Sequence, residues 1–78
     1  MVNIAQYRQI VMDTVNVRIR ELRVEHGFTQ QYVADLLGID RSNYSKYERG
    51  LLSVSADMLV ALAKLYDVTS DYLLGLDG

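Results

Sequence analysis

The chain has 78 residues, of which 50% are hydrophobic and 23% are charged, and its formal net charge at pH 7 is −2. A chain of this length buries only about 60% of its unfolded surface, so it supports one hydrophobic core and one domain. The composition is globular, which excludes a disordered or a collagen-like chain. The absence of cysteine excludes a disulfide framework, thiolate metal sites and cysteine nucleophiles.

The charge is unevenly distributed along the chain. Residues 1–54 carry seven basic and six acidic side chains, whereas residues 55–78 carry only Lys64 against four aspartates. A net negative charge counts against nucleic-acid binding, but here the acidic excess lies in the last third. The first residues show no basic segment followed by an apolar run, and no stretch approaches about 18 apolar residues. We therefore expect a cytoplasmic protein without a membrane segment.

The first fourteen residues predict an amphipathic helical extension. Asn3 and Gln6 form a variant capping box, and an apolar stripe follows with a helical period at Ile4, Tyr7, Val11 and Val15. Many residues here are β-branched, which lowers helix propensity. The helix therefore either breaks near residues 13 and 14 or runs into the next one.

The rest of the chain predicts five short helices around one core. Proline is absent, and apolar residues recur at spacings of three and four. Helices are expected at about residues 16–26, at 30–37 and 41–49, and from Ser55 and Ser70 onward. Thr29 and Asp40 are suited to accept the free amide hydrogens of the helices that follow them, and glycines 27, 38, 50 and 75 end the helical patterns. The fold class is thus an all-α, compact five-helix bundle at 15–75, with the extension at 1–14 and a tail at 76–78.

Residues 30–49 meet the demands of two helices that cross through a short turn. Ala34 permits close approach, Gly38 can adopt positive φ, and Ile39 fills the turn. Four further apolar side chains point inward, namely Val33, Leu37, Tyr44 and Tyr47. The sequence therefore predicts a helix-turn-helix.

The outward face of the second of these helices is polar and partly basic. With the two tyrosines inward, a rotation of 100° per residue turns Ser42, Ser45, Lys46 and Arg49 outward, flanked by Arg41 and Asn43. Guanidinium groups bind guanine, carboxamides bind adenine, hydroxyls bind either, and ammonium groups bind phosphate. The face has the chemistry of a major-groove reader, although two cations on a helix are often only a solvated surface.

The segment from Gly27-Phe28-Thr29-Gln30 to Glu48-Arg49-Gly50 resembles the lambda-repressor-like, Cro-type helix-turn-helix family. The resemblance extends from Arg18 to Gly75. It implies a five-helix domain that binds operator DNA as a two-fold dimer and regulates transcription. It also implies that Gln30 contacts the DNA backbone and braces the recognition helix, and that Arg23 pairs with Glu48 in a structural salt bridge. Arg41, Ser42, Ser45 and Lys46 would face bases or phosphates, with Asn43 as a secondary candidate.

Several features leave alternatives open. After Gly50 the family often has a basic residue and a proline, but this chain has Leu51-Leu52-Ser53-Val54, which predicts a weaker phosphate grip. The two leucines either pack under the next helix or form a dimer contact. Tyr32 either packs half-exposed or contacts a phosphate, and His26 suits a helix-end role.

The predicted function is a sequence-specific regulator of transcription, a repressor, which binds a palindromic double-stranded DNA operator as a homodimer. The sequence has no paired carboxylates, activated nucleophile or phosphate-binding glycine loop at a usable spacing. We therefore expect that the chain is not an enzyme and that it has no metal site, no cofactor and no small-molecule substrate. The alternative is a protein–protein interaction module that keeps the fold without specific DNA binding.

Overall fold

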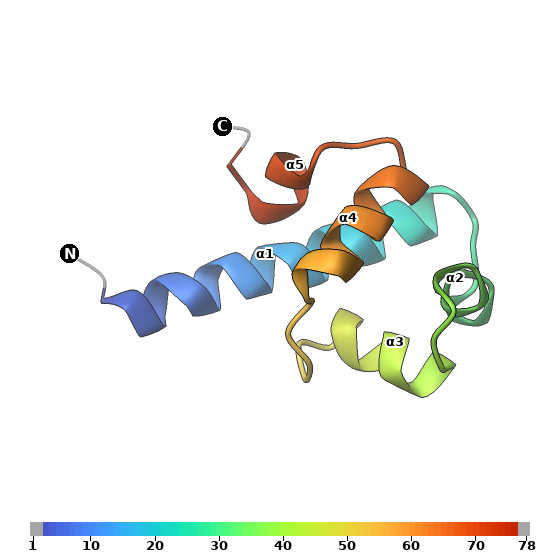
Figure 1. Ribbon diagram of the computed structural model, residues 1–78, viewed down its shortest axis with the longest axis horizontal. Helices are drawn as coiled ribbons and strands as arrows, with labels where there is room; N and C mark the ends of the chain where they lie inside the picture. Colours follow the sequence, from blue (N-terminus) through green and yellow to red (C-terminus); the bar gives the residue numbers. More distant parts are fainter. Residues whose placement is uncertain (1–2, 77–78) are drawn as a thin grey trace.

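The computed structural model describes residues 3–76, which form five α-helices and no strand (Figure 1). They are α1 (Ile4–Glu25), α2 (Gln30–Leu37), α3 (Arg41–Glu48), α4 (Ala56–Leu65) and α5 (Ser70–Leu74). The predicted all-α class is confirmed. The ends of the predicted extension and tail, at residues 1–2 and 77–78, lie outside the described residues.

α1 is one continuous helix of 22 residues, so the alternative of a break near residues 13 and 14 is wrong. The predicted capping box is present: Asn3 Oδ1 accepts from the Gln6 amide at 2.8 Å, and Gln6 Oε1 accepts from the Asn3 amide at 3.0 Å. Farther along, Val15 and Ile19 are fully buried. Packing of this kind outweighs the modest helix propensity of β-branched residues. The boundary predicted between residues 14 and 15 therefore lies inside a helix.

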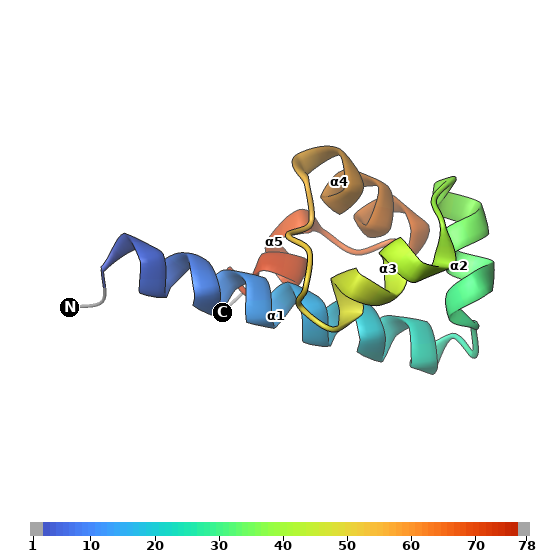
Figure 2. The same ribbon diagram turned by 90° about the horizontal axis from the view of Figure 1, so that it is seen from below.

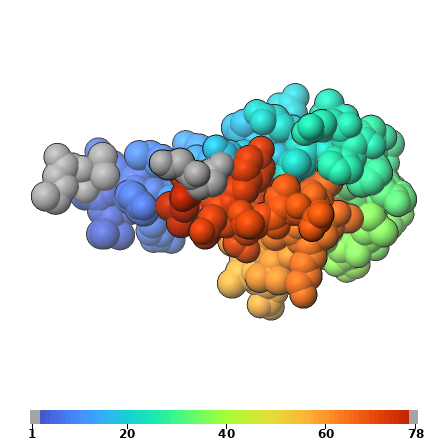
Figure 3. Space-filling view, turned by 90° about the horizontal axis from the view of Figure 1, so that it is seen from above, coloured from blue at the N-terminus to red at the C-terminus, as the bar shows by residue number. Residues whose placement is uncertain are grey.

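The amino-terminal part of α1 projects beyond the bundle (Figures 1 and 3). Of the predicted stripe, Val15 is buried and Val11 is half-buried, whereas Ile4 and Tyr7 are exposed. The space-filling view shows α5 packed beside the middle of α1, while the first turns of α1 stand apart (Figure 3). The extension is thus helical but only partly packed.

The core draws at least one fully buried apolar side chain from every helix. These residues are Val15 and Ile19 of α1, Val33 of α2, Tyr44 of α3, Leu62 of α4 and Leu73 of α5. Full burial of such a side chain contributes roughly 1.5–3 kcal/mol. The core thereby holds α2 and α3 against α1 and α4.

Besides α1, which is capped by Asn3, three helices begin with a side-chain cap on a backbone amide. Thr29 Oγ1 accepts from the Tyr32 amide at 3.0 Å, and Ser55 Oγ accepts from the Met58 amide at 3.3 Å. The last helix is capped by Thr69, so Ser70 is its first residue and not its cap. Each hydroxyl satisfies an amide that has no partner within its helix.

Two negative results concern only residues 3–76. No helix there is both long and apolar enough to span a bilayer. Nor do these residues bring together three histidine, cysteine or acidic side chains that could hold a metal ion.

Candidate nucleic-acid interface

α2 and α3 are joined by a tight turn at residues 38–40. Gly38 has φ of 70°, and the Ile39 amide donates to the Ala34 carbonyl at 3.0 Å. A Cβ on Gly38 would meet no atom within 4 Å, so the turn requires glycine for its left-handed backbone and not for space. In Figure 1 α2 is seen nearly end-on while α3 lies across the view, so the two helices cross steeply. The predicted helix-turn-helix is present.

Asp40 precedes α3, but the predicted cap through its carboxylate is wrong. Its side chain makes no hydrogen bond to a backbone amide of α3. Instead, Asp40 Oδ2 accepts from the Ser42 hydroxyl at 2.8 Å. The helix also ends one residue earlier than predicted, at Glu48, and Arg49 is its C-cap.

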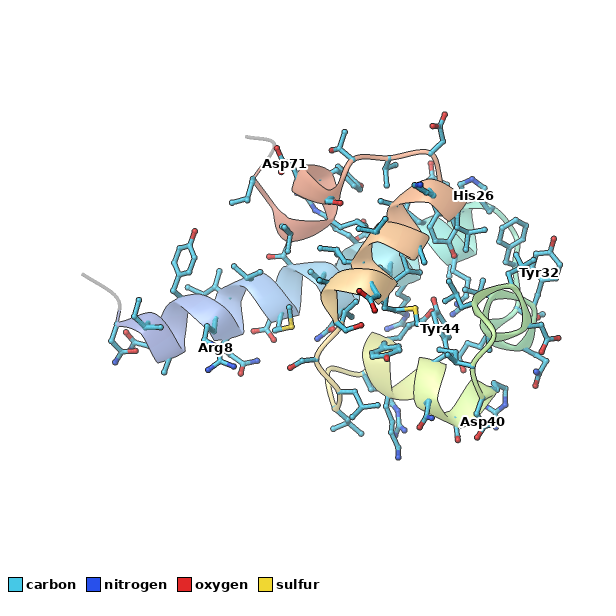
Figure 4. The ribbon with its side chains drawn as sticks, viewed as in Figure 1. Arg8, His26, Tyr32, Asp40, Tyr44 and Asp71 are labelled. Carbon is cyan, nitrogen blue, oxygen red and sulfur yellow. The ribbon has the colours of Figure 1, made fainter. Side chains whose placement is uncertain are left out.

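The two tyrosines of α3 differ in burial. Tyr44 is fully buried, as predicted, and points from α3 toward the other helices (Figure 4). Tyr47 is only half-buried at the edge of the core, so the prediction of a core residue is partly correct. Three residues correspond to 300° of rotation, which sets Tyr47 about 60° away from Tyr44 around the helix.

The predicted contact residues form one continuous surface along α3. The exposed members are Arg41, Ser42, Asn43, Lys46 and Arg49, and Ser45 is half-buried. Seen from below, no described element lies over α3 (Figure 2). We call these six residues the α3 face. It carries three cations and no carboxylate.

Gln30 is the first residue of α2 and is half-buried beside α3. Its amide nitrogen Nε2 donates to Glu48 Oε1 at 3.1 Å. A shallow hollow joins it to Ser45 of α3, to the C-cap Arg49 and to Arg20 of α1. The structure thus places Gln30 next to the α3 face, and its amide is braced against α3.

Glu48 and Arg23 form the predicted salt bridge beneath this surface. Arg23 Nε lies 2.7 Å from Glu48 Oε2, and Arg23 Nη1 donates to the Phe28 carbonyl at 2.9 Å. Burial favours the neutral carboxyl, but the hydrogen bonds from Arg23 and Gln30 outweigh it and hold the pKa of Glu48 below its usual value. The hydrogen bond to Glu48 raises the pKa of Arg23 in turn. Glu48 is therefore a neutralised anion and adds no repulsion to the α3 face.

Tyr66 is a structural residue whose polar surroundings the sequence did not reveal. It is buried, and the hydroxyls of Tyr44 and Tyr66 have no hydrogen-bond partner among the described residues. Burial, and next the Glu48 carboxylate, raise the pKa of both tyrosines. The two tyrosines belong to different helices, and no local pattern indicates that their hydroxyls share the environment of Glu48.

Aromatic side chains pack at the end of the bundle where α1 meets α2. Phe28 and Tyr32 rings lie 4.7 Å apart between centroids, and His26 and Tyr66 rings lie 5.1 Å apart. His26 Nδ1 is also 2.8 Å from the Leu22 carbonyl, which agrees with its predicted role at a helix end (Figure 4). Tyr32 thus has the expected half-exposed packing, and phosphate contact by its hydroxyl stays a prediction.

Leu51 and Leu52 follow α3 in an exposed turn. Leu51 is 63% exposed, so the interpretation that it packs under the next helix is wrong for this residue. Leu52 is partly covered but also counts as exposed. Their use in a dimer contact stays a prediction.

Comparison with known proteins gives a consistent assignment. The sequence model of a family described as "Helix-turn-helix" matches residues 19–73. The chain is 48% identical over 58 residues to the HTH-type transcriptional regulator AnsR of Bacillus subtilis (strain 168), covering 74% of this chain and 50% of the relative. It is 43% identical over 60 residues to the HTH-type transcriptional regulator ImmR of the same organism, covering 77% of this chain and 47% of the relative.

A third relative is a phage protein. The chain is 39% identical over 51 residues to the cryptic phage CTXphi transcriptional repressor RstR of Vibrio cholerae, covering 65% of this chain and 46% of the relative. The chain spans about half the length of these curated relatives. The matched family region runs from within α1 to within α5 and includes the whole α2–α3 unit. The chain therefore belongs to the helix-turn-helix family of Cro/CI type, the family of these transcriptional regulators.

Proposed function

We propose that the chain is a sequence-specific regulator of transcription, a repressor, that inserts α3 into the major groove of a palindromic operator as a homodimer. The observation that carries this proposal is the α3 face, which is mostly exposed, polar and cationic. The major groove of B-DNA admits an α-helix and displays a distinct pattern of donors and acceptors for each base pair. The relative RstR is named as a transcriptional repressor, which supports the same direction of regulation.

The residues of the α3 face divide into two chemical roles. Arg41 and Asn43, near the start of α3, have side chains that form bidentate hydrogen bonds to guanine and adenine, and each such pair is worth roughly 1–3 kcal/mol of discrimination. Lys46 and Arg49 supply charge for phosphates, and the hydroxyls of Ser42 and Ser45 suit either partner. Gln30 is the residue best placed to contact a phosphate at the start of α2 while it braces α3.

The net charge of −2 does not describe the charge of this surface. Asp40 is the nearest exposed carboxylate in sequence, and Glu48 is compensated by Arg23. The acidic excess lies in residues 55–78, which include α4 and α5. Local charge determines the attraction of a polyanion at distances within about 8 Å, the screening length at physiological ionic strength.

The alternative function is a protein-interaction module without specific DNA binding. The net negative charge and the exposed Leu51 favour it. A fluorescence titration of a random-sequence duplex separates the two functions. Our proposal requires binding at low salt whose affinity falls steeply as salt rises, because each phosphate contact releases counterions. Absence of binding at low salt would overturn it.

A further inference from the structure

An apolar stripe runs along the outer side of α1. Ile10, Val17 and Val24 are spaced seven residues apart and are 54%, 54% and 61% exposed. We call these three residues the α1 seam. Residues seven apart on an α-helix point in directions that differ by only about 20°, so the three side chains form one line. Val17 lies 200° around the helix from the buried Ile19, so the seam faces away from the core.

Two hollows lie on this stripe and share Val17 and Glu21. Ile10, Asp13, Thr14 and Val17 are among the residues that line the first hollow, and Val17, Arg20, Glu21 and Val24 are among those that line the second. Each set occupies positions i, i+3, i+4 and i+7. These are the four positions that surround the hole into which a side chain of a partner helix inserts in a coiled coil.

We propose that a second copy of this chain packs against the α1 seam with its own α1 antiparallel. Val17 of each copy enters the first hollow of the other copy, and Ile10 enters the second. The same alignment sets Tyr7 of one copy, which is half-exposed, against Val24 of the other. The surface is then complementary to itself, as a two-fold interface requires.

The charges beside the seam fit this alignment. Asp13 and Arg20 are seven residues apart and therefore lie on the same flank of α1. In the antiparallel pairing that flank meets the same flank of the second copy, so each Asp13 lies opposite the Arg20 of the other. The dimer then contains two ion pairs, each between Asp13 of one copy and Arg20 of the other, and no like charges meet on that flank.

The antiparallel direction rests on the proposed function, because both α3 faces must reach one side of the dimer. Figure 2 shows α1 along one edge of the molecule, with α2, α3 and α4 on the other side of it. The two-fold axis of the antiparallel dimer is parallel to the viewing direction of Figure 2 and passes just outside α1. Rotation about this axis leaves the α3 helices of both copies facing the viewer. A parallel pairing would have its axis along α1 and would turn the two α3 faces to opposite sides.

The spacing of the helices agrees with this arrangement. α3 packs on α1, and neighbouring helices lie about 8–10 Å apart, so the three steps from α3 through the two α1 helices to the second α3 add up to at most about 24–30 Å across the dimer. The lengthwise offset of each α3 from the axis adds to this span. Recognition helices on successive major grooves are about 34 Å apart.

The test is the oligomeric state of the chain without DNA. Only two side chains per copy insert at this interface, so it buries less area than a typical stable interface of about 1,600 Å² and the dimer is expected to be weak. Sedimentation equilibrium is therefore measured at concentrations up to the solubility limit. The parent is expected to form dimers. Val17→Glu and Asp13→Arg should each raise the dissociation constant of the dimer more than about tenfold, because they place a charge in the seam or a like charge beside it.

The matched control is Val60→Glu, which puts the same charge at a 48% exposed valine of α4 and should leave the dissociation constant unchanged. The double variant Asp13→Arg/Arg20→Asp exchanges the two charges and should restore association. Melting by circular dichroism checks that each variant is folded.

The proposal is overturned if the parent stays monomeric, if Val60→Glu weakens association as much as Val17→Glu, or if the double variant fails to recover. The outcomes separate the two proposals. Duplex binding by a chain that never self-associates rejects only the seam, whereas self-association without duplex binding rejects only the proposed function.

Discussion

Arg23 of α1 and Glu48 of α3 are joined by two nearly parallel hydrogen bonds, from Nε to Oε2 at 2.7 Å and from Nη2 to Oε1 at 3.1 Å. Gln30 of α2 donates to the same carboxylate. One side chain therefore links three helices, and it does so directly beneath the surface proposed to read DNA. The Glu48 side chain is only 3% exposed, so little water competes for these bonds.

Replacing Glu48 by glutamine should destabilise the fold. The change removes the charge that compensates Arg23, whose side chain is only 15% exposed. Breaking a buried ion pair by removing one partner costs about 3–5 kcal/mol, and the partial exposure of Arg23 lowers our expectation to about 2–4 kcal/mol. Urea denaturation measures the loss. The control Glu25→Gln changes an exposed carboxylate at the end of α1 and should shift the free energy of unfolding by less than about 0.5 kcal/mol.

The same carboxylate should make stability depend on acid pH. The pKa of Glu48 is lowered in the folded state from its ordinary value of 4.5, so the stabilisation is fully present above that value. It is lost as the pH falls through the folded pKa, because protonation removes the partner of Arg23. Denaturation midpoints measured between neutral and acid pH should fall most below pH 4.5 in the parent. Glu48→Gln should show a flatter profile, and an equally steep one would assign the acid sensitivity to other carboxylates.

Local signals in the sequence were sufficient to predict the helix-turn-helix scaffold. The left-handed conformation of Gly38 and the cap by Thr29 depend on neighbours within a few residues. The salt bridge between Arg23 and Glu48 spans 25 residues and was expected only through the family resemblance. A relationship between distant residues was missed: Tyr66, the C-cap of α4, shares its buried surroundings with Glu48 of α3, and no periodic pattern encodes that relationship.

There are physical reasons why the sequence alone did not predict the continuity of α1 or the contact of Asp40 with Ser42. Helix propensity disfavours the β-branched residues of α1, and only tertiary burial of Val15 and Ile19 reverses the balance. Asp40 can accept a hydrogen bond from a backbone amide of α3 or from a nearby hydroxyl. The sequence contains both options, and the structure adopts the second, with Ser42 as the donor.

Two glycines of the bundle should respond differently to substitution by alanine. Both Gly38 and Gly50 have positive φ, at 70° and 73°. Gly38 is otherwise open, so Gly38→Ala should cost only the left-handed backbone strain of about 1–2 kcal/mol. At Gly50 the new Cβ would also lie 2.6 Å from Nδ2 of the buried Asn16, so Gly50→Ala should cost measurably more. Thermal denaturation compares the two variants, and the double change Asn16→Ala/Gly50→Ala should recover part of the added loss. Equal costs would show that the Asn16 side chain simply moves aside.

Alanine substitutions at the two tyrosines of α3 should destabilise the fold by different amounts. Tyr44 is fully buried, and Tyr44→Ala is expected to cost about 3–5 kcal/mol, the range for loss of a large core aromatic. Tyr47 is half-buried, so Tyr47→Ala should cost about 1–3 kcal/mol because less apolar surface is lost. Urea denaturation of both variants tests the order, and a larger loss for Tyr47→Ala would contradict the burial described here.

Replacement of single side chains on the α3 face should separate base reading from phosphate binding. Arg41→Ala removes a guanidinium suited to guanine, and it should cost about 1–3 kcal/mol on preferred sequences while relaxing base preference at one position. Lys46→Ala should weaken binding to all sequences similarly and reduce the slope of log affinity against log salt by about one. Selection from a random duplex library followed by salt titrations measures both effects. Lys64→Ala on α4 serves as the control, since Lys64 is exposed but lies outside the α3 face. If both α3 variants select and bind duplexes as the parent does, α3 does not read DNA, because a helix in the major groove cannot lose these contacts without effect.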